Sequence, residues 1–367
     1  MKKVALLSLI IMFYCAFTTS LEAKNTLDSA AKTIKKETEF GKKAALELEK
    51  HIPRLLDPNK EAHLSLITSR LIPFLERDLD YNVRILEMKE PNAFSLPGGT
   101  TYITTGMLSF LKSDAEIAAI LAHEFVHADK AHVIKQNKKS SKLNLITLLG
   151  ILAATQGAGA PAMLVSSAVQ TAIINSYSIE MEKEADAIGI DILFKAGFNP
   201  TAMLTTMERL KVERLKRAYI NPGIYQTHPD DKERVEAALK YMKDKGIPVS
   251  RRDVVKKLNP EVVLISGDIS LTIDGITLIS IKESKKSTLL LTELAEKLNR
   301  YLELELAPYD IQVGTSNGEE ALYIKGNVII KESDSIPGIP KFSTLRTKIN
   351  DIINEARREN PISNYFQ

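Results

Sequence analysis

The pentapeptide His123-Glu124-Phe125-Val126-His127 restricts the fold of this 367-residue chain more than any other segment. Residues four apart in an α-helix lie on one face, so a helix here directs both imidazoles at a single point. This His-Glu-x-x-His pattern is typical of a zinc site in which the glutamate serves as a base. The pattern also fits a plain helix with surface histidines. If the site is real, the fold must bring another element against this helix to complete it.

The sequence around the pentapeptide predicts an amphipathic helix. Ser113 and Glu116 have the spacing of a capping box, which begins helices. Apolar residues then recur at helical spacing and predict the buried stripe: Ile117, Leu121, Phe125 and Ala128. His132 falls on a different face from His127 if the helix continues, so we expect it to be structural or to support the site indirectly.

A third zinc ligand is expected from a second helix, Tyr177–Gly197. The only cysteine, Cys15, lies near the N-terminus, which leaves histidine and carboxylate as ligands. Glu182 and Asp186 are four apart in this helix. We expect Glu182 to bind the metal and Asp186 to orient a ligand histidine. By spacing alone, the same carboxylates also fit a solvated helix face.

The N-terminus has the pattern of a secretory signal peptide, residues 1–23. Two lysines precede an apolar stretch, and small and polar residues follow up to Ala23. We therefore expect an exported chain; an uncleaved anchor is the alternative. Cys15 lacks the small preceding residues of a lipoprotein signal, which disfavours lipidation.

The sequence up to residue 248 predicts a mainly helical domain with a small sheet. Helical patterns cover Lys24–Leu79, and Tyr81–Met88 has a strand pattern. Asn92–Thr104 predicts two extended segments around a turn at Pro97-Gly98-Gly99. We expect these segments to offer an edge strand to a substrate backbone, and Thr101–Thr104 is the part to test. Leu143–Ile179 has no charged residue and predicts packed helices or, alternatively, a membrane-inserted hairpin.

Residues 249–367 predict a separate small α+β domain of unknown role. A hairpin turns at Asp274-Gly275, a helix covers Thr292–Leu304, and two short strands (Ile311–Val313 and Ala321–Ile330) precede a last helix. No catalytic motif occurs in this part. The predicted fold class is α+β throughout, with a zincin-like domain at 24–248.

Charge and composition disfavour a nucleic-acid partner. The net charge is +3 with both signs well mixed, and aromatic residues make up 6% with no tryptophan. Neither a basic surface nor a platform for base stacking is indicated.

Four segments in order resemble the gluzincin metallopeptidase family of the CAAX prenyl endopeptidase, HtpX and BepA, and in particular its periplasmic, BepA-like branch. The similarity covers about Glu39–Leu239. The segments are "NAFSLPGG", "HEFVHADKAH", "YSIEMEKEAD" and "THPDDKERV". Ile179 departs from the family pattern, which usually has arginine there. No repeat of the kind that some relatives use to hold partners is found after residue 248.

The resemblance implies one Zn²⁺ per chain with His123, His127 and Glu182 as ligands and Glu124 as general base. It further implies that His228 stabilises the oxyanion and that Arg234 lies near the substrate. Asp186 would steady a ligand histidine.

We therefore expect a zinc endopeptidase that acts on unfolded or misassembled cell-envelope proteins in the periplasm, with peripheral membrane association. Two alternatives stay open: a zinc-binding, chaperone-like assembly module, and an integral-membrane peptidase held by residues 143–179. The oligomeric state does not follow from the sequence.

Overall fold

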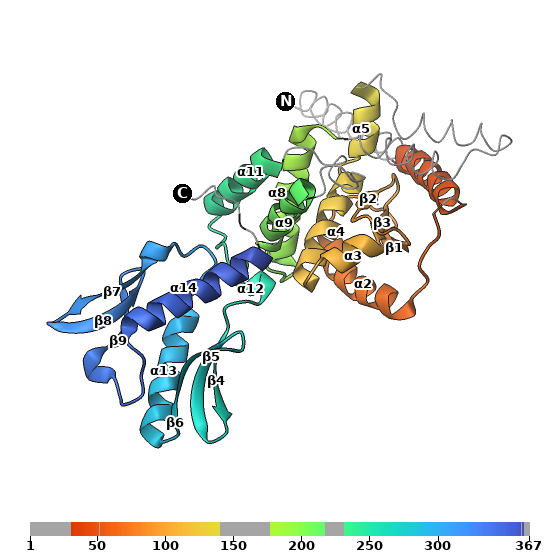
Figure 1. The fold of residues 1–367 in the computed structure, drawn as a ribbon. Helices are drawn as coiled ribbons and strands as arrows, with labels where there is room; N and C mark the ends of the chain where they lie inside the picture. The colour runs from red at the N-terminus through yellow and green to blue at the C-terminus, as the bar shows by residue number, and fades with distance from the viewer. Residues whose placement is uncertain (1–30, 51, 140–176, 217–230, 361, 363–367) are drawn as a thin grey trace, which may run out of the picture. The chain divides into compact units, whose positions relative to one another are not determined.

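The structure, a computed structural model, describes residues 31–50, 52–139, 177–216, 231–360 and 362 (Figure 1). The expected signal peptide, residues 143–176 of the uncharged segment, and His228 lie outside the described residues. The chain divides into two compact units. One comprises residues 1–110, 121–185 and 226–229, and the other comprises 111–120, 186–225 and 230–367. The domain boundary expected at residue 248 stays a prediction.

The first unit combines helices with one small sheet, as the α+β prediction requires. Its described elements are a helix at 31–50, α2 (Pro58–Leu71), the 3₁₀ turn η1 (Ile72–Phe74), β1 (Asn82–Leu86), β2 (Ala93–Ser95), β3 (Thr100–Thr104), α3 (Thr105–Phe110), much of α4 (Asp114–Asp129), α5 (His132–Lys139) and the start of α8 (Ile179–Lys195). Among the described residues, no helix is both long enough and apolar enough to span a membrane.

The sheet of the first unit has the strand order β1-β3-β2. β1 pairs with β3 in parallel, and β2 pairs with β3 in antiparallel. The turn predicted at Pro97-Gly98-Gly99 therefore joins β2 to β3. Of the two segments expected to offer an edge strand, the one tested through Thr101–Thr104 does not, because β3 is hydrogen-bonded on both sides. Of the two strands beside the turn, only β2 lies at an edge.

The helix at 31–50 packs on this sheet and on the turn. Ala44 and Leu48 join the buried cluster of Phe94 and Tyr102. The approach is close at Gly41, where an added Cβ would lie 1.7 Å from the Pro97 carbonyl oxygen. Glycine is required at this crossing because any side chain would collide with backbone.

α4 begins and ends with defined polar contacts. The Ser113 hydroxyl accepts a hydrogen bond from the Glu116 amide at 3.3 Å, which is half of the predicted capping box. The Glu116 carboxylate instead accepts from the Lys112 amide and pairs with Arg209. At the other end, Asp129 accepts from the Arg77 amide at 2.8 Å and from the Tyr81 hydroxyl at 2.9 Å.

α8 occupies most of the predicted range Tyr177–Gly197 and ends where the sequence suggests. Gly197 has a left-handed φ of +73°, and the Phe198 amide donates to the Leu193 carbonyl at 2.9 Å. This is the Schellman pattern of a glycine-terminated helix.

The second unit continues through helices into two small sheets. Beyond α8 its described elements are α9 (Ala202–Lys216), α11 (Asp231–Asp244), α12 (Arg251–Val255), β4 (Pro260–Ile265), β5 (Asp268–Ile273), β6 (Ile276–Lys282), α13 (Lys285–Tyr301), the 3₁₀ turn η2 (Pro308–Asp310), β7 (Ile311–Ser316), β8 (Glu319–Ile324), β9 (Asn327–Lys331), the 3₁₀ turn η3 (Glu332–Asp334) and α14 (Phe342–Glu359).

Two copies of a three-strand meander followed by a helix make up residues 260–359 (Figure 1). Both copies turn at residue pairs with positive φ, Ser266-Gly267 and Asp274-Gly275 in the first and Asn317-Gly318 and Lys325-Gly326 in the second. The pairs recur at an offset of 51 residues, as does the register shift after Leu271 and Leu322. The hairpin predicted at Asp274-Gly275 is confirmed, whereas this duplication was not predicted.

The two copies share one hydrophobic core. α13 contacts β4, β5 and also β9, while α14 contacts β7, β8 and also β6. Leu291 of α13 and Ile349 of α14 are members of the same buried cluster. Arg251, only 1% exposed, connects α12 to α9 through a bidentate ion pair with Glu208 and also pairs with Glu305 at 2.7 Å.

Candidate metal centre

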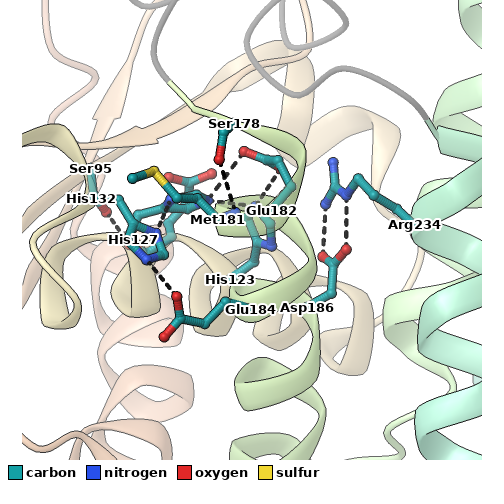
Figure 2. A network of polar contacts seen from close by, with 11 residues as sticks. Ser95, His123, His127, His132, Ser178, Met181, Glu182, Glu184, Asp186 and Arg234 are labelled. Atoms are coloured by element: carbon teal, nitrogen blue, oxygen red, sulfur yellow. Dashed lines mark hydrogen bonds and ion pairs between the residues drawn. The ribbon is translucent and has the colours of Figure 1, made fainter. Parts of the chain in front are cut away.

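Two helices supply a buried group of metal-binding side chains. α4 provides His123 and His127 one helical turn apart, and α8 provides Glu182 (Figure 2). His123 is 3% exposed, and the other two are fully buried. Helix periodicity explains the histidine pair, and packing of the first turns of α8 against α4 brings the carboxylate to it.

The facing atoms of these three side chains form a compact triangle. The Nε2 atoms of His123 and His127 are 3.0 Å apart. Oε2 of Glu182 lies 3.4 Å from His123 Nε2, and its Oε1 lies 3.5 Å from His127 Nε2. Ligand atoms at about 2.05 Å from a tetrahedral zinc are separated by about 3.3 Å. These distances, with Glu182 presenting one oxygen to each histidine, are close to the separation of ligand atoms around one zinc ion.

The composition of the triangle matches its size. Two imidazole nitrogens and one carboxylate oxygen form a zinc ligand set known from peptidases, and they leave the fourth position for a reacting group. Among the described residues, this is the group of histidine and acidic side chains whose ligand atoms all lie within 4.8 Å of one another. His132 is outside the group.

Glu124 is fully buried beside the first histidine, on the same helix. Its backbone carbonyl accepts a hydrogen bond from the Ser95 hydroxyl at 2.7 Å. Ser95 is the last residue of edge strand β2 and also contacts the Thr101 hydroxyl at 2.6 Å. The edge strand is thereby attached directly to the helix turn that carries Glu124.

His127 is in contact with two further rings, those of Tyr177 and His132. Tyr177 stacks on its face with ring centroids 3.7 Å apart and planes at 22°. His132 meets it edge-on, with the two Nδ1 atoms 2.9 Å apart. Burial lowers the pKa of His132 despite the opposing effect of the nearby Glu184 carboxylate, so neutral imidazole is favoured.

The position of His132 differs from the one expected for a continuous helix. α4 ends at Asp129, Ala131 adopts a left-handed φ of 52°, and His132 begins the separate helix α5. A continuous helix would place His132 on a different face from His127. The interruption instead turns its ring back to His127, while its expected supporting role is compatible with the contact observed.

Asp186 and Arg234 form a buried bidentate ion pair. Nε of Arg234 donates to Asp186 Oδ2 at 2.8 Å, and its Nη2 donates to Oδ1 at 2.7 Å (Figure 2). The sequence predicts separate roles for them, Asp186 as the partner of a ligand histidine and Arg234 as a residue near the substrate. The roles predicted for them, and for His228, stay predictions.

The sequence does not mark Tyr177 or Ser95 as part of the site, and it marks Glu184 only as one of the carboxylates of the second helix. Tyr177 immediately precedes the ligand-bearing helix, but one aromatic residue at a helix start carries no chemical signal. Burial, together with the Glu124 and Glu182 carboxylates, raises the pKa of Tyr177 well above its usual value. Its hydroxyl is therefore protonated at neutral pH.

Residues 58–242, half of the chain, match the sequence profile of Peptidase family M48. The chain belongs to this family. The resemblance and the enzyme class predicted from the sequence are confirmed at the level of this family of zinc metallopeptidases.

Characterised relatives are similar over part of their length. The beta-barrel assembly-enhancing protease of Escherichia coli K12 is 25% identical over 246 residues, covering 65% of this chain and 48% of the relative. The mitochondrial metalloendopeptidase OMA1 of Saccharomyces cerevisiae is 30% identical over 160 residues, covering 41% and 44%. The OMA1 of Arabidopsis thaliana is 34% identical over 156 residues, covering 41% and 30%. The chain thus spans about half, or less, of these relatives.

Proposed function

We propose that this member of the M48 family is a zinc-dependent endopeptidase. The observation that carries the proposal is the triangle of His123, His127 and Glu182, whose atoms lie 3.0–3.5 Å apart around one point. A fully buried carboxylate, Glu124, belongs to the same helix turn. Family membership supports the same chemistry.

In this proposal the three side chains hold Zn²⁺, which would polarise the peptide carbonyl and acidify a water molecule. Glu124 takes a proton from the attacking water and delivers it to the leaving amine nitrogen. Glu124 is fully buried on the helix turn that carries His123, so its carboxylate lies beside the proposed metal position. His228 as oxyanion partner rests on the family resemblance alone.

The edge strand β2 is proposed to bind the substrate backbone. It is an edge strand of the sheet β1-β3-β2, and Ser95 connects it to the Glu124 carbonyl. A polypeptide added to this edge would gain main-chain hydrogen bonds with little sequence preference. The substrate would then lie against the strand that is anchored to the helix of the proposed base.

The proposed setting is the cell envelope, with unfolded or misassembled proteins as substrates. Three points support it: the signal-peptide pattern of residues 1–23, the predicted lack of sequence preference, and the similarity to a protease whose name describes the enhancement of β-barrel assembly. Peripheral association with a membrane is part of the same proposal.

The decisive experiment compares the purified mature chain with its Glu124→Gln variant. Both should bind one zinc per chain, because Glu124 is not a ligand. Wild type should degrade unfolded casein, and the variant should be slower by about 10²–10⁴-fold, as expected for the loss of a general base. Chelation should abolish the wild-type activity, and added zinc should restore it.

Two further results would favour the alternative functions. Zinc binding without cleavage of any unfolded protein would favour the chaperone-like module. A chain that stays with the membrane after carbonate extraction would favour the integral-membrane peptidase. Cleavage that persists undiminished in Glu124→Gln would refute the assignment of the base.

A further inference from the structure

Three side chains in sequential contact, Glu184, His132 and His127, connect solvent to the Nδ1 side of a proposed zinc ligand. Glu184 Oε2 lies 3.3 Å from Nε2 of His132, and Nδ1 of His132 lies 2.9 Å from Nδ1 of His127 (Figure 2). His127 then directs Nε2 into the ligand triangle. Glu184 is 46% exposed on its side chain, whereas both histidines are fully buried.

The chemistry of imidazole assigns every proton along these three side chains. If His127 Nε2 gives its lone pair to a metal, the neutral ring carries its proton on Nδ1. That N–H points at Nδ1 of His132, which must then be the acceptor. His132 in turn carries its proton on Nε2, where Glu184 provides a carboxylate oxygen as acceptor. No other arrangement of neutral rings satisfies both contacts while leaving His127 Nε2 available.

We propose that His132, oriented by Glu184, is a positioning residue that fixes the ring and tautomer of His127 for metal binding. This inference rests on the proposed function, because it requires His127 to be a ligand. The residues that accept hydrogen bonds from ligand histidines hold the ring in place and increase its basicity.

Two further observations agree with this role. Tyr177 stacks on the face of the His127 ring, so the ring is restrained in plane by His132 and out of plane by Tyr177. In addition, His132 is not itself within the ligand group, although it is buried beside it. A histidine that is buried beside the triangle but excluded from it is well placed to accept a hydrogen bond from His127.

The test replaces His132 with side chains that keep or remove the acceptor. Asparagine places its amide oxygen near the position of Nδ1, glutamine extends toward the position of Nε2, and leucine offers no acceptor. Zinc affinity of the full mature chain is measured by competition with a chromophoric chelator. His132→Leu and His132→Gln should lose about 10–100-fold in affinity, and His132→Asn should stay within about 3-fold of wild type.

Replacing His63, an exposed histidine of α2, with asparagine provides a control that should leave zinc affinity unchanged. The visible absorption of the Co²⁺-substituted protein adds a readout of ligand geometry. It should change in His132→Leu and be retained in His132→Asn. Circular dichroism of the metal-free proteins identifies a variant that misfolds. If His132→Leu misfolds, the comparison of His132→Asn with His132→Gln tests the inference instead.

The outcomes distinguish this inference from the proposed function. If wild type binds zinc and all His132 variants bind it equally well, the inference is refuted while the proposed function stands. Equal losses in His132→Asn and His132→Leu would also refute it, because the acceptor would then be irrelevant. If wild type itself binds no zinc, the proposed function fails and the inference fails with it.

Discussion

Replacing Glu182 with glutamine should remove most of the stabilisation that zinc gives to the folded protein. Glu182 directs one carboxylate oxygen at each histidine of the triangle, at 3.4 and 3.5 Å. Glutamine keeps the shape, but it replaces one oxygen with an amide nitrogen and removes the negative charge. Loss of a residue that merely supports a ligand costs about 10–100-fold in metal affinity. Loss of a ligand should therefore cost at least about 100-fold.

Linkage converts this loss into a measurable shift of the melting temperature. At a free zinc concentration of 100 times the wild-type Kd, binding stabilises the folded state by about 2.7 kcal/mol. A 100-fold weaker site gains only about 0.4 kcal/mol at the same concentration. With about 2–4 °C per kcal/mol, zinc should raise the wild-type Tm by about 5–11 °C and that of Glu182→Gln by less than about 2 °C.

Differential scanning calorimetry with and without zinc measures both shifts. Glu180→Gln is the matched control, because it removes the same charge from an exposed position two residues earlier in α8. It should retain the full wild-type shift. If zinc raised the Tm of Glu182→Gln as much as that of wild type, this carboxylate would not hold the metal. The assignment of the triangle as the zinc site would then be refuted.

Further substitutions at Gly41, at the Arg251–Glu208 pair and at Tyr177 test the packing around the site and beyond it. Gly41→Ala should destabilise the fold by about 1–3 kcal/mol in urea unfolding, because its Cβ would collide with the Pro97 carbonyl. Arg251→Ala should cost about 3–5 kcal/mol by leaving Glu208 buried without its cation, whereas Arg251→Met with Glu208→Leu should cost much less. Tyr177→Phe should keep zinc affinity, since stacking on His127 needs only the ring, while Tyr177→Ala should lower it.

The cluster of His123, His127 and Glu182, which we propose as ligands, could be predicted because most of its signals are local. His123 and His127 follow from helix periodicity, and the side chain of Glu182 was placed by its helix and by the family resemblance together. The turn at Gly98 and the hairpin at Asp274-Gly275 likewise depend on residues that favour positive φ. The histidine pair and the two turns are each determined within a few consecutive residues, whereas the assignment of Glu182 also needed the family resemblance.

The strand order of the first sheet could not be predicted, because it depends on contacts between segments that are distant in the sequence. Both segments beside the Pro97 turn have strand patterns, and nothing in either one indicates which is central. β1, which precedes them, pairs with β3 and not with β2. That choice leaves β2 at the edge and moves the proposed substrate contact from Thr101–Thr104 to Ala93–Ser95.

The duplication after residue 259 could not be predicted either, because its two copies have few identical residues. The two copies share turn glycines and the tetrapeptide Ile-Lys-Glu-Ser, at 281–284 and 330–333, but few other residues. Their strands face one core and need only apolar side chains at alternate positions. Many different sequences satisfy that requirement, so the copies can diverge while the fold stays the same.

The break at Ala131 shows how one backbone conformation changes the chemistry assigned to a residue. In a continuous helix, His132 would lie about 140° around the axis from His127, and the two rings could not meet. The interruption could not be predicted, because alanine rarely adopts positive φ. The sequence has neither a glycine nor an asparagine at this position to indicate that the helix ends. The observed φ of 52° ends α4 and brings His132 Nδ1 to 2.9 Å from His127 Nδ1. Because the proposed positioning role needs this contact, a variant that restored a continuous helix here should weaken zinc binding as His132→Leu does.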